Sequence, residues 1–185
     1  MRIFLDLDGV LVNWSGGLCN LLGIDPYCKE AQEILSSDKP IEGWKFGSKD
    51  DVENAVLSAG YDFWINLETL PWAERLIQLC AKYGEVYFLT SPHIFHAGAH
   101  AKFDYIYDNF NSTNIAITKH KYLCAKPNHI LIDDYIKNLD EWEKESGTGF
   151  KWPCQWQLRK DPELLEETFS KLEGLLAIKK VTYLP

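Results

Sequence analysis

Three short apolar segments of this sequence, at 2–7, 85–90 and 129–133, each run into carboxylates or hydroxyls. The polar side chains at their ends are Asp6, Asp8, Thr90, Ser91, Asp133 and Asp134. If the segments are parallel strands, their carboxyl ends meet at one edge of a sheet, which is where such sheets bind ligands. Four carboxylates gathered there would repel one another unless a cation lies between them. A site of this kind, with room left for water and phosphate, suits Mg²⁺.

Each strand end also has a plainer interpretation when it is taken alone. The segment 6–9 could be an acidic turn, because Asp and Gly are common turn residues. A calcium-binding EF-hand loop does not fit, since its fifth and twelfth positions would be Val10 and Gly17. The Thr-Ser-Pro segment at 90–92 could be an ordinary helix N-cap. The three strand ends together favour a functional site over these alternatives.

The elements that must position these side chains alternate along the chain. We expect strands at 2–7, 85–90, 114–118 and 129–133. We expect helices of the flanking layers at 70–84, 97–110, 135–144 and 162–178. Strands that alternate with helices predict an α/β fold with a mostly parallel sheet flanked by helices.

Residues 13–67 differ in composition from the rest of the chain and hold several Trp and Phe side chains. Three helical patches are expected there, near 15–22, 28–37 and 49–59. Ser48 and Asp51 have the spacing of an N-cap for the last of these patches. We therefore expect a core at 1–12 and 68–185, with a small helical insert at 13–67 after the first strand.

The composition limits the partners of this chain of 185 residues. It holds 27 Asp and Glu against 19 Lys and Arg, a net charge of −8, which makes it a poor binder of long nucleic acid. A small phosphorylated ligand remains compatible, because one metal ion can reverse the local field. We expect no membrane span and no signal peptide, and hence a cytoplasmic protein, because long uncharged apolar runs are lacking. The 14% of aromatic residues could also cover a homodimer interface.

In order along the chain, DLDGVLVNW, FLTSP, a Lys and ILIDD resemble the four motifs of the haloacid dehalogenase (HAD) superfamily of phosphohydrolases. The resemblance covers 1–12 and 68–145 and implies a Rossmann-like core, with 13–67 as a small helical cap over the site. In addition, FWINLETLPWA is similar to the F-x-x-L-x-x-L-P-x-A pattern of the 5′(3′)-deoxyribonucleotidases. This finer resemblance implies an enzyme that dephosphorylates deoxyribonucleoside monophosphates with Mg²⁺ as its cofactor.

The same resemblance implies a role for each carboxylate. Asp6 would be the nucleophile that forms an aspartyl-phosphate, and we expect it to be ionised at neutral pH without help from a base. Asp8 would be the general acid that protonates the leaving alcohol and then activates water. Mg²⁺ would be held by Asp6 and by the backbone carbonyl of Asp8. Asp133 would be a further ligand, with Asp134 supporting the metal or its waters.

Hydroxyls and lysines would hold the phosphate. Thr90 resembles the hydroxyl of the second motif, and Ser91 could add a donor. Lys121 resembles the third-motif lysine, although the chain from it to Asp133 is longer than the family's. Two other lysines in that stretch therefore stay open: Lys119 and Lys126. Lys102 matches a second family lysine near the phosphate, and an exposed helix position is its alternative.

The aromatic side chains of the insert could bury one another or stack on a nucleobase. Trp44 and Phe63 are the leading stacking candidates by position. We therefore expect substrate choice to depend on 13–67 and catalytic competence on residues outside it. Three histidines share one helical face, with a spacing that could hold zinc or simply be solvated: His93, His96 and His100.

Three classes of function follow. The first is a Mg²⁺-dependent deoxyribonucleotidase. The second is a related phosphatase that acts on a phosphosugar or a nucleic-acid end. The third is a catalytically silent protein that uses the same fold only to bind. The presence of both Asp6 and Asp8 argues against the third class, and the acidic charge argues against a long nucleic-acid substrate.

Overall fold

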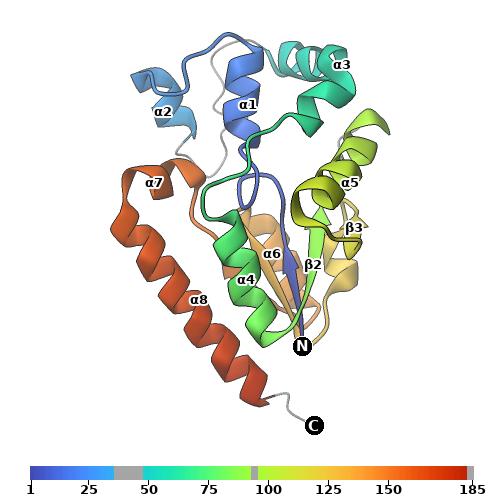
Figure 1. Cartoon of the computed structure of the whole chain (residues 1–185), viewed down its shortest axis with the longest axis vertical. Helices are drawn as coiled ribbons and strands as arrows, with labels where there is room; N and C mark the ends of the chain where they lie inside the picture. The colour runs from blue at the N-terminus through green and yellow to red at the C-terminus, as the bar shows by residue number, and fades with distance from the viewer. Residues whose placement is uncertain (36–47, 93–95, 183–185) are drawn as a thin grey trace.

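The computed structural model describes residues 1–35, 48–92 and 96–182 (Figure 1). Its centre is a five-stranded sheet in the order β3-β2-β1-β4-β5, and every pair of neighbouring strands is parallel. The strands are β1 Arg2–Leu5, β2 Glu85–Thr90, β3 Ile115–Ile117, β4 His129–Asp133 and β5 Thr148–Lys151. The predicted α/β fold with a parallel sheet is confirmed.

The helices fall into an insert group and a core group. In the insert they are α1 Trp14–Leu21, α2 Lys29–Leu35 and α3 Lys49–Ile65. In the core they are α4 Ala73–Tyr83, α5 His96–Phe110, the 3-10 helix η1 Lys121–Cys124, α6 Ile136–Lys144, α7 Gln155–Lys160 and α8 Pro162–Thr182. Across the described ranges, none of these helices has both the length and the apolar content to cross a membrane.

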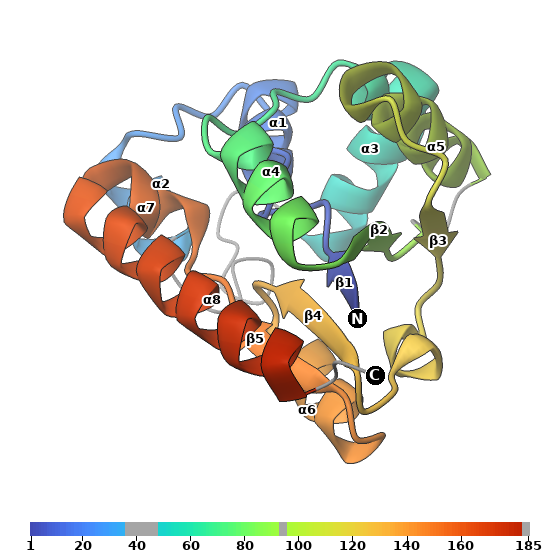
Figure 2. The same ribbon diagram turned by 60° about the horizontal axis from the view of Figure 1, so that its bottom comes forward.

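Helices cover both faces of the sheet, because successive strand residues point to opposite sides. Ile3 and Leu5 of β1 belong to a large core shared with α4, α5 and α8. Phe4, between them, points the other way and packs with Trp142 of α6. Figure 2 shows α4 and α8 side by side on one face, and these helices contact each other directly. Strands covered on both sides explain why β1 and β4 are continuous apolar runs.

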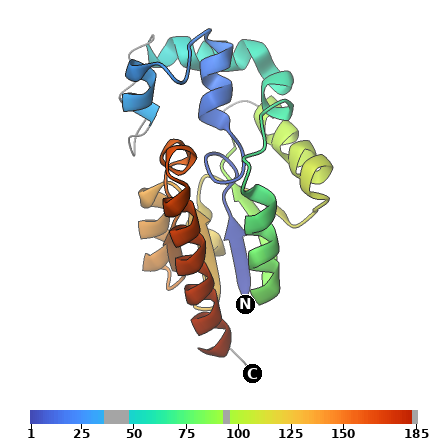
Figure 3. The same cartoon turned by 60° about the vertical axis from the view of Figure 1, so that its left-hand side comes forward.

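The insert helices lie beyond the carboxyl ends of the strands (Figures 1 and 3). The chain leaves the core and returns to it through two adjacent segments. Val12 forms an antiparallel bridge with Thr69. The amide of Asn13 donates to the carbonyl of Glu68 over 2.8 Å, and the amide of Leu70 donates to Leu11 over 2.8 Å. This short ribbon fixes the insert above the edge of the sheet where β1 ends.

Four elements differ from the sequence prediction, and one of them is the short 3-10 helix η1, which was not predicted. The edge strand β5 was not predicted, because its sequence Thr-Gly-Phe-Lys has no apolar run and is half exposed. Helix α7 was also missed, since it has only six residues. The helix predicted at 49–59 begins at Lys49 after the expected N-cap Ser48, which forms a reciprocal capping box with Asp51, but it continues to Ile65. Gly60 kinks it at a φ of 59° and does not end it.

The missed helix α7 joins the core to the insert. The indole of Trp156 packs with Cys19 and Ala31 of α1 and α2. Its Nε1 donates to the hydroxyl of Ser15 over 2.9 Å. The side-chain amide Nε2 of Gln155 donates to the side-chain oxygen of Asn13, also over 2.9 Å. The insert is therefore attached to the core by side-chain contacts as well as by its two chain connections.

Candidate active site

The loop after β1 turns sharply and brings its carboxylates to the end of the sheet. The amide of Asp6 still donates to the carbonyl of Ile132 in β4, over 3.0 Å. The chain then turns at Gly9, whose φ is +82°, and its amide donates to Val12 over 2.9 Å. A Cβ at Gly9 would lie 2.2 Å from Oδ2 of Asp134. Glycine is therefore required here twice, by the backbone conformation and by the close carboxylate.

Three carboxylates meet at this edge of the sheet. Asp6, Asp133 and Asp134 each offer an oxygen within 4.8 Å of the others. Asp6 and Asp133 are buried, and Asp134 is half-buried. The ammonium of Lys121 lies 2.7 Å from Oδ1 of Asp6 and 2.7 Å from Oδ2 of Asp133. One lysine thus bridges the carboxylates that end two neighbouring strands.

Lys121 is the buried member of the three lysines that the sequence left open, and the other two, Lys119 and Lys126, are exposed. The short helix η1 begins at Lys121 and turns its side chain inward. The structure therefore places Lys121, and not its neighbours, against the carboxylates of Asp6 and Asp133.

Asp133 is held by two further donors. Its Oδ1 accepts from the amide of Tyr135 over 2.8 Å, and its Oδ2 accepts from the side-chain amide of Asn138 over 2.9 Å. Asn138 lies on the first turns of α6 and was not among the predicted site residues. Its signal in the sequence is its place five residues after the strand end, where a helix that starts there can fold back over the carboxylate.

A second lysine, Lys102, contacts three further predicted site residues: Asp8, Thr90 and Ser91. The ammonium of Lys102 pairs with Oδ2 of Asp8. It also donates to the hydroxyl of Thr90 over 3.2 Å and to the backbone carbonyl of Ser91 over 2.9 Å. Lys102 is buried, so the exposed helix position considered as its alternative is wrong. The Asp8 carboxylate therefore faces Lys102 and lies outside the three-carboxylate cluster around Asp6.

Burial and crowding shape the electrostatics. The pKa of Asp6 is raised to about 7, first by burial and then by the neighbouring Asp133 and Asp8, while Lys121 lowers it. Burial, with Asp6 and Asp133, also raises the pKa of Asp134 well above its usual value. Burial alone would lower the pKa of Lys121, but the Asp6 and Asp133 charges raise it. Without a cation the Asp6 carboxyl is thus only partly ionised at neutral pH. Its ionisation beside Mg²⁺ without help from a base stays a prediction.

The carboxylate cluster fits Mg²⁺. Its donors are hard oxygens from Asp6, Asp133 and Asp134, the ligand type this ion prefers, and they cover only part of an octahedral shell. Burial is the main cause of the raised pKa values of Asp6 and Asp134, and the neighbouring carboxylates raise them further despite Lys121. A divalent cation among the same oxygens would oppose both shifts.

The structure describes one of the two candidates for base stacking. Trp44 lies outside the described residues. Phe63 is buried, and its ring packs edge-on against Trp64 with centroids 5.0 Å apart. In this arrangement Phe63 fills the interior of the insert, so its stacking on a base stays a prediction. Within the described part of the insert, the ring of Trp64 lies over the Lys102 ammonium at 4.7 Å.

Of the three histidines, His93 and the side chain of His96 lie outside the described residues. His100 is exposed, and its Nε2 lies 3.2 Å from a carboxylate oxygen of Asp104, one helical turn away. His100 therefore fits the alternative given by the sequence, a solvent-exposed helix face. The zinc interpretation of the three side chains together stays a prediction.

Comparison with known proteins finds similarity in fold. No protein-family model and no curated protein matches this sequence. Among solved structures, a HAD family hydrolase from Deinococcus radiodurans R1, determined with bound phosphate and sodium, aligns with a TM-score of 0.57 and 15% identity. The match covers 96% of this chain and 95% of that one.

A haloacid dehalogenase-like family hydrolase from Streptococcus pneumoniae aligns with a TM-score of 0.53 and 19% identity, covering 81% of this chain and 83% of that one. Both matches have low sequence identity, so they establish a likeness of fold alone. The chain therefore has a Rossmann-like fold of the kind seen in HAD family hydrolases.

Proposed function

We propose that this chain is a Mg²⁺-dependent phosphomonoester hydrolase, and more narrowly a 5′(3′)-deoxyribonucleotidase. The observation that carries the proposal is the meeting of Asp6, Asp133 and Asp134 around the Lys121 ammonium at the carboxyl edge of a parallel sheet. Such a site holds a nucleophile, a place for a cation and positive charge for a phosphate dianion. The likeness of fold to HAD family hydrolases supports the same reaction class.

In the first half of the reaction, the Asp6 carboxylate attacks phosphorus. A bond forms between Asp6 and phosphorus, and the bond from phosphorus to the ester oxygen breaks. The departing oxygen takes a proton from Asp8, which becomes a carboxylate next to Lys102. Mg²⁺ held by Asp6, Asp133 and Asp134 would supply positive charge that reduces repulsion between phosphate and carboxylates.

In the second half, water attacks the phosphorus of the aspartyl-phosphate. Asp8 takes a proton from that water, which restores its acid form, and phosphate leaves as the Asp6 carboxylate is regenerated. Lys121, which lies next to Asp6, and the hydroxyl of Thr90 would neutralise and orient the phosphate oxygens in both halves. The nucleophile and the proton donor thus come from the loop after β1, and the metal position adds the carboxylates at the end of β4.

The narrower proposal concerns the substrate. Its support is the FWINLETLPWA segment, which resembles that of deoxyribonucleotidases, and the aromatic insert at 13–67 that lies over the sheet edge. We propose that this insert is a cap that contacts the nucleoside. The net charge of −8 favours a mononucleotide over a long nucleic acid. A cytoplasmic location and a homodimer stay part of this proposal.

A substrate panel tests the proposal directly. Release of inorganic phosphate is measured with and without Mg²⁺ on 5′- and 3′-deoxynucleotides, ribonucleotides, phosphosugars and phosphorylated oligonucleotide ends. We expect Mg²⁺-dependent release, fastest from a deoxynucleoside monophosphate. Faster release from phosphosugars or oligonucleotide ends would select the second class of function. If the wild-type chain releases phosphate from none of these esters, the third class of function, a catalytically silent binding protein, is favoured.

A further inference from the structure

The ammonium of Lys102 is completely enclosed by protein groups. A lysine carries three N–H donors. Those of Lys102 face Oδ2 of Asp8, the hydroxyl of Thr90 and the backbone carbonyl of Ser91. Its side chain is only 3% exposed. With its donors already committed, Lys102 serves first to fix these protein groups relative to one another.

The remaining side of this ammonium is covered by the insert. The indole of Trp64 in α3 lies over it, with the nitrogen 4.7 Å from the ring centroid. Trp64 is itself buried. The negative face of an indole attracts a cation, and this attraction is strongest where water is excluded. The Lys102 ammonium therefore has a cation–π contact with Trp64 in addition to its three hydrogen-bond acceptors.

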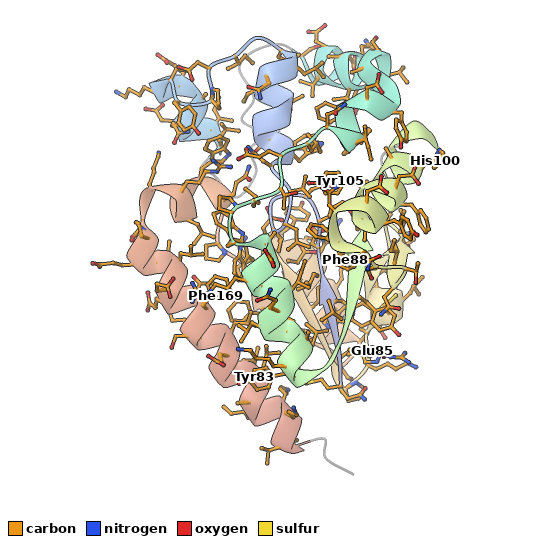
Figure 4. The ribbon with its side chains drawn as sticks, viewed as in Figure 1. Tyr83, Glu85, Phe88, His100, Tyr105 and Phe169 are labelled. Atoms are coloured by element: carbon orange, nitrogen blue, oxygen red, sulfur yellow. The ribbon has the colours of Figure 1, made fainter. Side chains whose placement is uncertain are left out.

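Helix α3 can do this because it packs along α5, the helix that carries Lys102. Thr69, just after α3, is hydrogen-bonded to the hydroxyl of Tyr105 over 2.6 Å. Beside this contact, Tyr61 of α3 donates to Asp104, the α5 residue before Tyr105, over 2.8 Å. Figure 4 labels Tyr105 and His100, which mark the length of α5 that lies next to the insert. Trp64 lies between these two anchoring contacts in the sequence.

Asp8 is held by one oxygen only. Its Oδ2 pairs with Lys102, whereas its Oδ1 is buried and has no hydrogen-bond partner within the described part of the chain. A carboxylate fixed in this way presents one oxygen in a defined direction. That oxygen is suited to carry the proton that Asp8 exchanges with the leaving group and with water.

We propose that Trp64 is a positioning residue of the reaction: it holds Lys102 against Asp8 and so fixes the oxygen of Asp8 that transfers the proton. This inference rests on the proposed function. It also assigns part of the catalytic competence to the insert, whereas the sequence led us to expect that 13–67 governs only the choice of substrate. The insert then acts on the chemistry of every alkyl phosphate, whether or not that substrate carries a base.

The proton transfer makes this inference testable through the leaving group. An alkyl oxygen needs the proton from Asp8 as its bond to phosphorus breaks, whereas p-nitrophenolate is stable enough to leave without one. The ratio kcat/KM covers the steps up to departure of the alcohol or phenol. A displaced Asp8 should therefore lower kcat/KM for alkyl phosphates and spare p-nitrophenyl phosphate.

The experiment measures kcat/KM of the full chain with Mg²⁺ on three substrates: a deoxynucleoside monophosphate, β-glycerophosphate and p-nitrophenyl phosphate. Trp64→Leu removes the ring over Lys102, and Trp64→Phe restores a smaller one. Tyr61→Phe is the matched control, because it removes a hydrogen bond between the same two helices without touching Lys102. Thermal unfolding of each variant measures the folded fraction.

We expect Trp64→Leu to lower kcat/KM about 10- to 100-fold on both alkyl phosphates, because a misplacement of about 1 Å can cost about 10²-fold. p-Nitrophenyl phosphate should change less than about threefold, Trp64→Phe should recover part of the loss, and Tyr61→Phe should retain all three activities.

A loss confined to the deoxynucleotide would overturn the inference and make Trp64 a base-stacking residue. An equal loss on all three substrates would also overturn it, because it would show a merely structural role. In both cases wild-type activity would still support the proposed function. A wild type that hydrolyses none of the three esters would refute the proposed function together with this inference.

Discussion

Replacing Gly9 with Ala should lower the free energy of unfolding moderately. It should also raise the Mg²⁺ concentration that gives half-maximal activity. Gly9 has a φ of +82°, a conformation that costs an L-residue about 1–2 kcal/mol. Part of that cost is regained, because Ala restricts the unfolded chain by about 0.4–1 kcal/mol relative to Gly. We therefore expect the free energy of unfolding to fall by roughly 1 kcal/mol from the backbone alone.

The larger effect comes from the added methyl group. Its Cβ would lie 2.2 Å from Oδ2 of Asp134 and 3.0 Å from the Cγ of that residue, whereas ordinary contacts begin near 3.4 Å. The carboxylate of Asp134 must therefore move by about 1 Å or more, away from Asp6 and Asp133. Loss of a supporting group at a metal site typically lowers metal affinity about 10- to 100-fold. We expect a shift of that size in the Mg²⁺ concentration that gives half-maximal activity.

Gly23→Ala provides the control, because Gly23 has a φ of +66° and its Cβ would meet nothing within 4 Å. It should lose a similar amount of stability and keep the wild-type Mg²⁺ dependence. Urea unfolding measures the first quantity for both variants, and phosphate release titrated with Mg²⁺ measures the second. An unchanged Mg²⁺ dependence in Gly9→Ala would refute the placement of Asp134 beside the metal.

The other predictions concern the reacting carboxylates and the cation. Asp6→Asn should abolish turnover while the far-ultraviolet circular dichroism stays unchanged, and substantial residual turnover would contradict its role as nucleophile. Asp8→Asn should lower the rate by about 10²- to 10⁴-fold, as is typical for a general acid–base group, and a loss under about tenfold would mean that another group moves the proton. EDTA should stop phosphate release and Mg²⁺ should restore it, with Asp133→Ala needing far more Mg²⁺. Better restoration by zinc would return attention to the histidines near His100.

The sequence predicted the sheet well because its central strands are buried on both faces and so appear as short apolar runs. Strand β5 was missed because it lies at the exposed edge of the sheet and is not an apolar run: Gly149 and Lys151 interrupt the pattern. The predicted helix at 49–59 was shorter than α3, because a Gly such as Gly60 often marks the end of a helix in the sequence. The five residues after that kink include Trp64, so the contact with Lys102 could not be predicted.

The site was predictable in its residue types more than in its pairings. Strand ends placed Asp6, Asp133 and Asp134 together, since parallel strands must end at one edge. Spacing could not choose among the lysines between β3 and β4, because only the 3-10 turn of η1 buries Lys121. Likewise, the resemblance to HAD phosphohydrolases suggested Lys102 as a phosphate ligand, but its contact with Asp8 depends on how α5 packs, which no local pattern encodes.

The place of β1 in the sheet has a consequence for how the molecule assembles. It is the first strand of this chain and the middle strand of the sheet, where Arg2 pairs with Glu85 on one side and with His129 on the other. Both pairings are far apart in sequence, which makes sheet formation slow compared with the closing of local contacts. Until β4 is available, an apolar strand lacks one of its two neighbours and is open to wrong partners. Strand β1, which leads into Asp6, is therefore the strand through which β2 and β3 join β4 and β5 during folding.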